Sequence, residues 1–234
     1  MILVVKHISI EGPGLIGDYF KRKGYELKTV ELEEGDKLPE RLDGIEAVIT
    51  LGGPMNVYDE EKYPYLKGED IFIKKVINEH IPYLGLCLGA QLLAKAVGAQ
   101  IKKAPEEEIG FYKVELTPEG ITDALFDGVE KDMDVFQWHG DTFDVPEGGI
   151  LLATADKCPN QAFRVGRNAY GLQFHLEIDG NIIEDWTQEY FDSSDEILRQ
   201  KGREMLTRYD EIRDDLKKNV EKVCQNFIDF LINS

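Results

Sequence analysis

Short apolar segments alternate with amphipathic helical patterns over the first hundred residues of the chain. Runs rich in β-branched and aromatic residues predict buried strands at residues 2–5, 25–32, 45–51 and 83–86. Between them, apolar residues recur at three- and four-residue steps, which predicts helices from about Pro13 to Gly24 and over residues 66–80. Such alternation is typical of an α/β fold with an open, mostly parallel, flavodoxin-like central sheet flanked by helices.

The pattern changes after Gly98, which closes a third predicted helix. Residues 111–116, 133–136, 150–155, 161–165 and 169–174 are strand-like and are separated by turns, so we expect a mixed or antiparallel part there. From Asn181 onward the composition is helical. We therefore expect one domain over residues 1–180, with residues 181–234 forming a C-terminal helical extension packed on it.

The C-terminal extension carries an apolar stripe at helical spacing, formed by Tyr209, Ile212, Leu216, Val220, Val223, Phe227 and Phe230. Two interpretations stay open. The stripe either packs on the chain's own sheet, which is the more ordinary outcome, or forms the seam of a homodimer or of a complex with another protein.

Composition narrows the classes of partner. The 234 residues include 27 basic and 45 acidic side chains, a formal net charge of −18. A body this acidic repels phosphate backbones, which argues against nucleic acid as a primary partner. Its apolar runs fall far short of the roughly 20 residues that a membrane span needs. The N-terminal segment reads as a strand rather than a signal peptide, so we expect a cytoplasmic protein with no membrane association.

Three cysteines, Cys87, Cys158 and Cys224, are widely spaced and form no C-x-x-C pair. Neither a disulfide framework nor a zinc ribbon is indicated. Cys158 precedes a proline in a turn and Cys224 lies in the last predicted helix, so we expect both to be structural.

Cys87 has a different setting, because it joins a predicted strand directly to a predicted helix. Gly85 and Gly89 flank it at two residues on either side, and a side chain at either position would collide in such a sharp bend. At a helix N-terminus the free backbone N–H groups stabilise a thiolate. The N–H of Leu88 would point to the same place and could hold an oxyanion. The ordinary alternative is a small buried hydrophobic residue.

His175 and Glu177 supply the other groups that a cysteine nucleophile needs. On an extended segment, residues i and i+2 share a face, so Glu177 can orient the ring of a histidine that acts as base. Gly52 and Gly53 follow a strand at the carboxyl edge of the sheet, where Gly53 could donate a second oxyanion contact. Considered one at a time, His175 would be interpreted as a core histidine, Glu177 as a solvated acid and the two glycines as a loop turn.

Together, the three segments resemble the class I, or triad, glutamine amidotransferases. Gly85, Cys87, Gly89 and Gln91 match the motif G-x-C-x-G-x-Q, and His175 with Glu177 matches His-x-Glu. The resemblance implies that Cys87 attacks the side-chain amide of glutamine, that a γ-glutamyl thioester forms, and that ammonia leaves. His175 would move the proton, and Gly53 and Leu88 would bind the oxyanion. The reaction would need no cofactor.

Substrate contacts are implied for Gly52, Gln91, Trp138 and His139. The segment from Phe136 to Asp141 is most similar to the branch that contains the amidotransferase domain of GMP synthase and its free-standing relatives. Trp138 departs from that branch, which usually has serine at this position, so the choice of substrate is open. The Trp138 indole would either line the pocket or pack in the core. A metal site made from His139, Asp141, His175 and Glu177 is the less favoured interpretation, since the triad already explains two of the four.

Three functions compete at this point. The first is a glutaminase whose ammonia goes to a separate acceptor, a synthetase subunit, since these residues contain no phosphate-binding G-x-x-x-x-G-K-[ST] loop. The second is a γ-glutamyl peptidase that applies the same thioester chemistry to larger γ-glutamyl amides. The third is a non-catalytic regulatory module, which an intact set of Cys87, His175 and Glu177 argues against.

Overall fold

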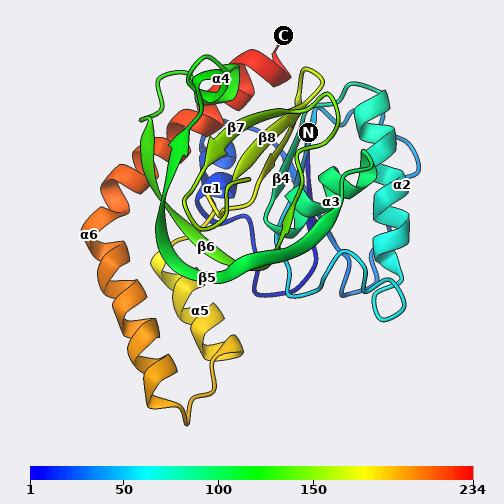
Figure 1. Ribbon diagram of the computed structural model, residues 1–234. Helices are drawn as coiled ribbons and strands as arrows, with labels where there is room; N and C mark the ends of the chain where they lie inside the picture. Colours follow the sequence, from blue (N-terminus) through cyan, green and yellow to red (C-terminus); the bar gives the residue numbers. More distant parts are fainter. Residues whose placement is uncertain (234) are drawn as a thin grey trace.

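A single twisted sheet forms the centre of the computed structural model, which describes residues 1–233 (Figure 1). In this described part, nine strands lie in the order β2-β1-β3-β4-β9-β8-β7-β5-β6. Their bounds are β1 Ile2–Lys6, β2 Leu27–Glu31, β3 Ala47–Thr50, β4 Tyr83–Leu86, β5 Ile101–Leu116, β6 Asp132–Phe143, β7 Ile150–Thr154, β8 Ala162–Val165 and β9 Ala169–Leu172.

The first part of the sheet is parallel and the second part antiparallel. β2, β1, β3, β4 and β9 run parallel to their neighbours, with β9 completing a flavodoxin-like order. β8, β7, β5 and β6 continue the sheet with antiparallel pairing. The predicted α/β fold class is therefore confirmed.

Helices cover both faces of the sheet (Figure 1). They are α1 Gly14–Arg22, α2 Tyr65–Asn78, α3 Leu88–Ala96, α4 Pro118–Ile121, α5 Gly180–Tyr190 and α6 Glu196–Phe227, with a short 3₁₀ turn at Ala124–Phe126 and a π turn at Ile228–Ile232. Apolar residues of α1 and α6 share one core with the sheet, and those of α2 and α3 share the other. No helix of the described residues is long and apolar enough to cross a membrane.

β5 and β6 are much longer than the predicted segments 111–116 and 133–136. They form one antiparallel ribbon whose ladder is interrupted between Lys103 and Glu108, where Pro105 lies. Proline and a run of charged residues read as a loop in the sequence, but proline is tolerated at such an interruption. The ribbon matters for the site because it carries Trp138 and His139 to the carboxyl end of β4.

The C-terminal helices lie against the body of the chain. Ile212, Leu216, Val220, Val223 and Phe227 of α6 are buried in the core that α1 also lines. The Tyr19 hydroxyl of α1 donates to the Gln225 side chain at 2.7 Å. Phe230, the last residue of the predicted stripe, is 46% exposed.

Candidate active site

Cys87 lies in a strained bend between β4 and α3. Its backbone has φ +48° and ψ −104°, on the side of the map that side chains rarely adopt. A Cβ on Gly85 would lie 2.4 Å from the Gly89 carbonyl oxygen, and one on Gly89 would lie 2.2 Å from that of Thr50. Both glycines are therefore required by close backbone approach, as the sequence predicts.

His175 and Glu177 form a buried pair beyond the end of β9. Nδ1 of His175 lies 2.6 Å from Oε1 of Glu177, and both residues are at most 2% exposed. The His175 N–H donates to the Phe136 carbonyl at 2.9 Å, which ties this segment to β6. In the neutral ring, Nδ1–H donates to the carboxylate and Nε2 carries the lone pair. Nε2 is buried and has no hydrogen-bond partner among the described residues.

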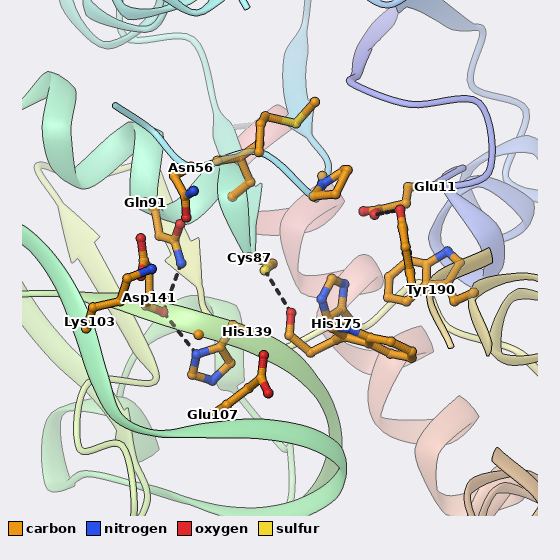
Figure 2. A pocket seen from close by; sticks show the side chains of 17 residues that line it. Glu11, Asn56, Cys87, Gln91, Lys103, Glu107, His139, Asp141, His175 and Tyr190 are labelled. Atoms are coloured by element: carbon orange, nitrogen blue, oxygen red, sulfur yellow. Dashed lines mark hydrogen bonds and ion pairs between the residues drawn. The ribbon is translucent and has the colours of Figure 1, made fainter. Parts of the chain in front are cut away.

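Cys87 and His175 line the same cavity, whose volume is about 320 Å³ (Figure 2). Burial alone would lower the pKa of His175, but the Glu177 carboxylate and the adjoining Cys87 sulfur outweigh it, so its pKa is well above the usual value. The Gln173 amide nitrogen lies 3.7 Å from the Cys87 sulfur and directs a donor at it.

The oxyanion candidates, Gly53 and Leu88, also line this cavity. Leu88 is the first residue of α3, so its N–H has no acceptor within the helix. A Cβ on Gly53 would lie 3.0 Å from a side-chain carbon of Leu88, so Gly53 packs against the Leu88 side chain.

Gly52 is placed differently from the other predicted substrate contacts. It is not among the cavity-lining residues of the described chain, and its carbonyl accepts a hydrogen bond from Nδ1 of His7 at 2.9 Å. A Cβ there would lie 2.6 Å from a Glu11 carboxylate oxygen and 3.0 Å from the His175 ring. Gly52 thus leaves room for side chains of the site.

Gln91 and Trp138 both reach the cavity. Gln91 donates through Nε2 to the Asp141 carbonyl at 3.0 Å, which fixes its amide. The Trp138 carbonyl oxygen lies 3.7 Å from the Cys87 sulfur. The Trp138 indole is half-buried and packs on Phe191 with ring centroids 5.1 Å apart, so it belongs both to the wall and to a small core.

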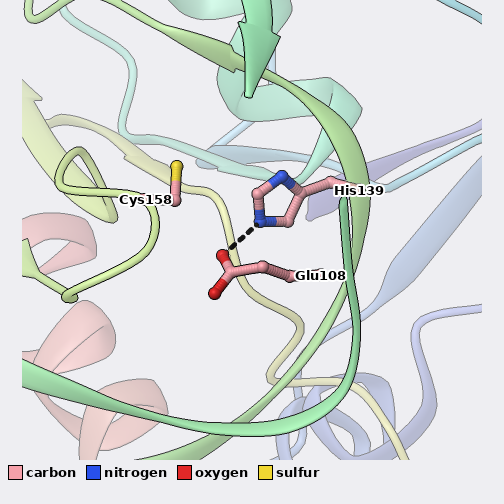
Figure 3. A group of neighbouring side chains, drawn as sticks. All are labelled: Glu108, His139 and Cys158. Atoms are coloured by element: carbon pink, nitrogen blue, oxygen red, sulfur yellow. Dashed lines mark hydrogen bonds and ion pairs between the residues drawn. The ribbon is translucent and has the colours of Figure 1, made fainter. Parts of the chain in front are cut away.

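His139 is held in a buried cluster with Glu108 and Cys158 (Figure 3). Its Nδ1 donates to the Asp141 carbonyl at 3.0 Å and its Nε2 lies 3.1 Å from Glu108. The Cys158 thiol donates to the Thr142 hydroxyl at 3.2 Å. Each group thus has a protein partner, and the cluster fixes the β6 segment that borders the cavity. His175 and Glu177 are not part of it.

The other two thiols lack activating surroundings. Burial raises the pKa of both Cys158 and Cys224. Such thiols stay protonated and inert near neutral pH.

Sequence reasoning missed Glu11, a buried acid in the cavity wall. Burial raises its pKa to about 7, against opposing effects of the His175 charge and of the Tyr190 hydroxyl, which donates to Glu11 at 2.9 Å. Its position in the sequence could have indicated it, because Glu11 follows β1 at the carboxyl edge of the sheet, where ligands bind in open α/β folds.

Helix α5 closes the cavity on the His175 side, where Trp186 and Tyr190 both line it. Tyr190 lies beside Glu11 (Figure 2). The Trp186 ring contacts the His175 ring edge-on, with centroids 4.9 Å apart, and its N–H donates to the Ile10 carbonyl at 3.3 Å. The predicted C-terminal extension therefore contributes directly to the site.

The family described as "Glutamine amidotransferase class-I" matches residues 14–185 of this chain. The chain belongs to the class I glutamine amidotransferase family. Its match covers the bend at Cys87, the His175 segment and the first turns of α5. Members of this family are cysteine-based glutamine amidohydrolases.

Individual relatives agree with the family assignment. The glutamine amidotransferase-like protein YfeJ of Salmonella typhimurium is 28% identical over 212 residues, 89% of this chain and 87% of that protein. GMP synthase of Porphyromonas gingivalis is 35% identical over 160 residues, 67% of this chain but 30% of the synthase, so the match spans less than a third of that enzyme. The crystal structure of a glutamine amidotransferase from Thermotoga maritima has a TM-score of 0.88 at 35% identity and covers 97% of each chain.

Proposed function

We propose that this amidotransferase hydrolyses the side-chain amide of glutamine through a triad of Cys87, His175 and Glu177. The single observation that carries the proposal is the free Nε2 of His175, which adjoins the Cys87 sulfur in one cavity while Nδ1 is committed to Glu177. A base with one nitrogen oriented and the other unoccupied is the arrangement that activates a thiol.

In the first half-reaction, His175 takes the thiol proton and the sulfur attacks the amide carbon of glutamine. The negative charge that develops on the amide oxygen is stabilised by the N–H groups of Gly53 and Leu88. The carbon–nitrogen bond then breaks as His175 returns its proton to the departing nitrogen. Ammonia leaves, and a γ-glutamyl thioester remains on Cys87.

In the second half-reaction, water attacks the thioester while His175 removes one of its protons. The carbon–sulfur bond breaks, glutamate leaves and the proton returns to the sulfur. Glu177 keeps the imidazole in the tautomer that both halves require.

A small amino acid suits the size and charge of the cavity. Its volume of about 320 Å³ lies at the lower end of the range for small-molecule sites. Lys103, which is ion-paired with Asp141 at 2.6 Å, and Glu107 line it with charges of opposite sign, which complement the α-carboxylate and the α-ammonium group of an amino acid. We propose that Gln91, which also lines the cavity, contacts the same part of the substrate.

Ammonia release from glutamine tests the proposal directly. The purified chain should release ammonia, and Cys87→Ala should not, while Cys224→Ala, the matched control on a buried thiol outside the cavity, should retain activity. A chloroketone analogue of glutamine should alkylate Cys87 before the other two thiols. Even labelling of all three cysteines, or equal ammonia release by the Cys87→Ala variant, would contradict an activated thiol.

A second candidate is hydrolysis of γ-glutamyl amides whose amine is larger than ammonia. The observation that favours it is the wall on the His175 side, where Trp138, Trp186, Tyr190 and the Glu11 carboxyl form an aromatic and acidic surface. A panel of γ-glutamyl dipeptides and γ-glutamyl amines compared with glutamine separates the two. Activity confined to the larger amides would replace the first proposal with this one.

A separate synthetase subunit is the acceptor that we propose for the ammonia, because the chain resembles only the amidotransferase part of GMP synthases. Such coupling predicts slow glutamine hydrolysis by the isolated chain and a rise in kcat when the acceptor binds. A full rate without any acceptor would contradict it. A homodimer, the other assembly expected from the sequence, is tested by light scattering of the full chain.

A further inference from the structure

His7 and Glu69 form a second buried histidine–carboxylate pair, outside the proposed triad. His7 follows β1 directly, and Glu69 lies in the second turn of α2. Nε2 of His7 lies 3.1 and 3.0 Å from the two carboxylate oxygens of Glu69. Both side chains are completely buried, and neither lines the cavity.

The contacts of His7 match a ring that carries protons on both nitrogens. Nδ1 lies 2.9 Å from the Gly52 carbonyl oxygen, which can only accept a hydrogen bond. Nε2 faces a carboxylate, which also accepts. Burial alone would lower the pKa of His7, but the charge and hydrogen bonds of Glu69 and the Gly52 carbonyl raise it above the usual value. Glu11 adds a weaker effect in the same direction, and the Tyr65 ring lies 6.3 Å away.

The hydrogen bond from His7 fixes the peptide that joins Gly52 to Gly53. In a trans peptide the C=O and N–H groups point in opposite directions, so anchoring the carbonyl on His7 turns the Gly53 N–H away from it. Two adjacent glycines would otherwise allow this peptide to rotate freely. A Cβ on Gly53 would lie 3.0 Å from the His7 Cβ, so His7 also packs directly beneath the peptide.

We propose that the His7–Glu69 pair is a positioning device for the oxyanion site, which fixes the Gly52–Gly53 peptide and strengthens its N–H as a hydrogen-bond donor. A hydrogen bond from an imidazolium is about twice as strong as one from a neutral ring. Electron density drawn toward the Gly52 oxygen makes the N–H of the same peptide more acidic, since hydrogen bonds in a chain polarise one another.

This inference rests on the proposed hydrolysis, because it assigns Gly53 the role of binding the oxyanion. His7 touches no substrate and is a positioning residue. Its effect should appear in the transition state, where the oxyanion exists, and not in the binding of the uncharged amide.

Glu69→Gln is the variant that isolates the charge. Glutamine keeps the shape of Glu69 and can donate to Nε2 of a neutral His7, which still donates from Nδ1 to Gly52. Removing a whole oxyanion donor costs about 10²–10³-fold in kcat, so weakening one should lower kcat by about tenfold. The KM for glutamine should stay within about twofold. The inhibition constant of the aldehyde analogue of glutamine, which forms a tetrahedral adduct on sulfur, should rise by about tenfold.

Asp123→Asn is the matched control for the loss of a buried acid. Asp123 accepts hydrogen bonds from Tyr170 and Arg164 at 3.0 and 2.7 Å, and it does not line the cavity. This variant should lose stability while it keeps the kcat and the aldehyde affinity of the unchanged chain.

Nitrogen NMR of labelled histidine and glycine provides a readout that does not depend on turnover. His7 should be doubly protonated at pH 7 in the unchanged chain and singly protonated in Glu69→Gln, and the Gly53 amide proton should move upfield. If the chain hydrolyses glutamine but Glu69→Gln leaves kcat and the aldehyde affinity unchanged, the positioning role is wrong while the proposed function stands. If no γ-glutamyl amide is hydrolysed, the proposed function fails, and an unmoved Gly53 amide would overturn the polarisation as well.

Discussion

Replacing Cys87 by glycine and by alanine measures the strain in the bend independently of any activity. At an ordinary helix or strand position, glycine is less stable than alanine by roughly 0.5–1 kcal/mol. At φ +48° and ψ −104° this order should reverse, because glycine adopts that conformation without a steric penalty.

The size of the reversal follows from three effects. A side chain held in such a conformation costs on the order of 1–3 kcal/mol, which glycine would relieve. Against this gain, the greater backbone freedom of glycine costs roughly 0.5–1 kcal/mol, and loss of the buried alanine methyl group, at a site that is 6% exposed, costs at most about 0.8 kcal/mol. The Cys87→Gly variant should therefore be more stable than Cys87→Ala by roughly 0.5 kcal/mol, which corresponds to about 1–2 °C in Tm for a chain of this size.

Urea unfolding followed by circular dichroism gives the comparison. Ala94→Gly in α3 is the matched control, since Ala94 is fully buried in regular helix, and it should be less stable than the unchanged chain by about 1 kcal/mol or more. If Cys87→Gly is also less stable than Cys87→Ala by about 1 kcal/mol, the bend is unstrained. The sulfur is then not presented in the way that the proposed chemistry needs.

Three further predictions test charges and packing. Glu11 has a folded-state pKa of about 7 against an ordinary 4.5, so the native state binds more protons than the unfolded state between these values, and the free energy of unfolding falls by up to about 3 kcal/mol as pH rises through that window. From pH 5 to pH 8, the free energy of unfolding of the unchanged chain in urea should therefore fall by this order relative to that of Glu11→Gln. Parallel curves would contradict the burial of a titrating acid. Glu177→Gln removes the charge that raises the His175 pKa, so the imidazole should titrate at lower pH by NMR and kcat should fall less than in Cys87→Ala; an unshifted titration would rule out the charge effect. Asn226 donates to the carbonyls of Leu125 and Asp127 at 2.9 and 2.8 Å, so Asn226→Ala should cost about 2–4 kcal/mol in urea unfolding without changing kcat; an unchanged midpoint would show that these carbonyls find other partners.

The parts of the site that sequence could predict are those set by local geometry. The bend at Cys87 depends on glycines two residues away, and the contact between His175 and Glu177 depends on a two-residue spacing along an extended chain. Both features are visible without knowledge of the rest of the fold. The length of β5 could not be predicted in this way, because its N-terminal half is charged and contains Pro105. Only pairing with β6 makes this half a strand.

Contacts between distant segments account for most of what was missed. The Glu11 carboxyl meets Tyr190, 179 positions further along the chain, and Trp186 reaches Ile10 across 176 positions. Periodicity places each residue on its own helix or loop, but it does not say which loops meet at the cavity. The predicted boundary at residue 180 assigned α5 to a separate C-terminal extension, so the contribution of α5 to the cavity wall was not expected.

Glu69 shows how such a contact could be found from sequence. It lies three positions after Leu66 and seven before Val76, on the same face of α2 as the buried Leu66, Ile73 and Val76. A carboxylate on an apolar helix face is too costly to bury without a partner. The partner must come from the sheet that this face covers, and the described ends of β1 and β3 place His7 and the Gly52 carbonyl there. A charge that breaks an apolar stripe therefore predicts a buried ion pair, and a pair at the carboxyl edge of a parallel sheet directs attention to the backbone of the active site.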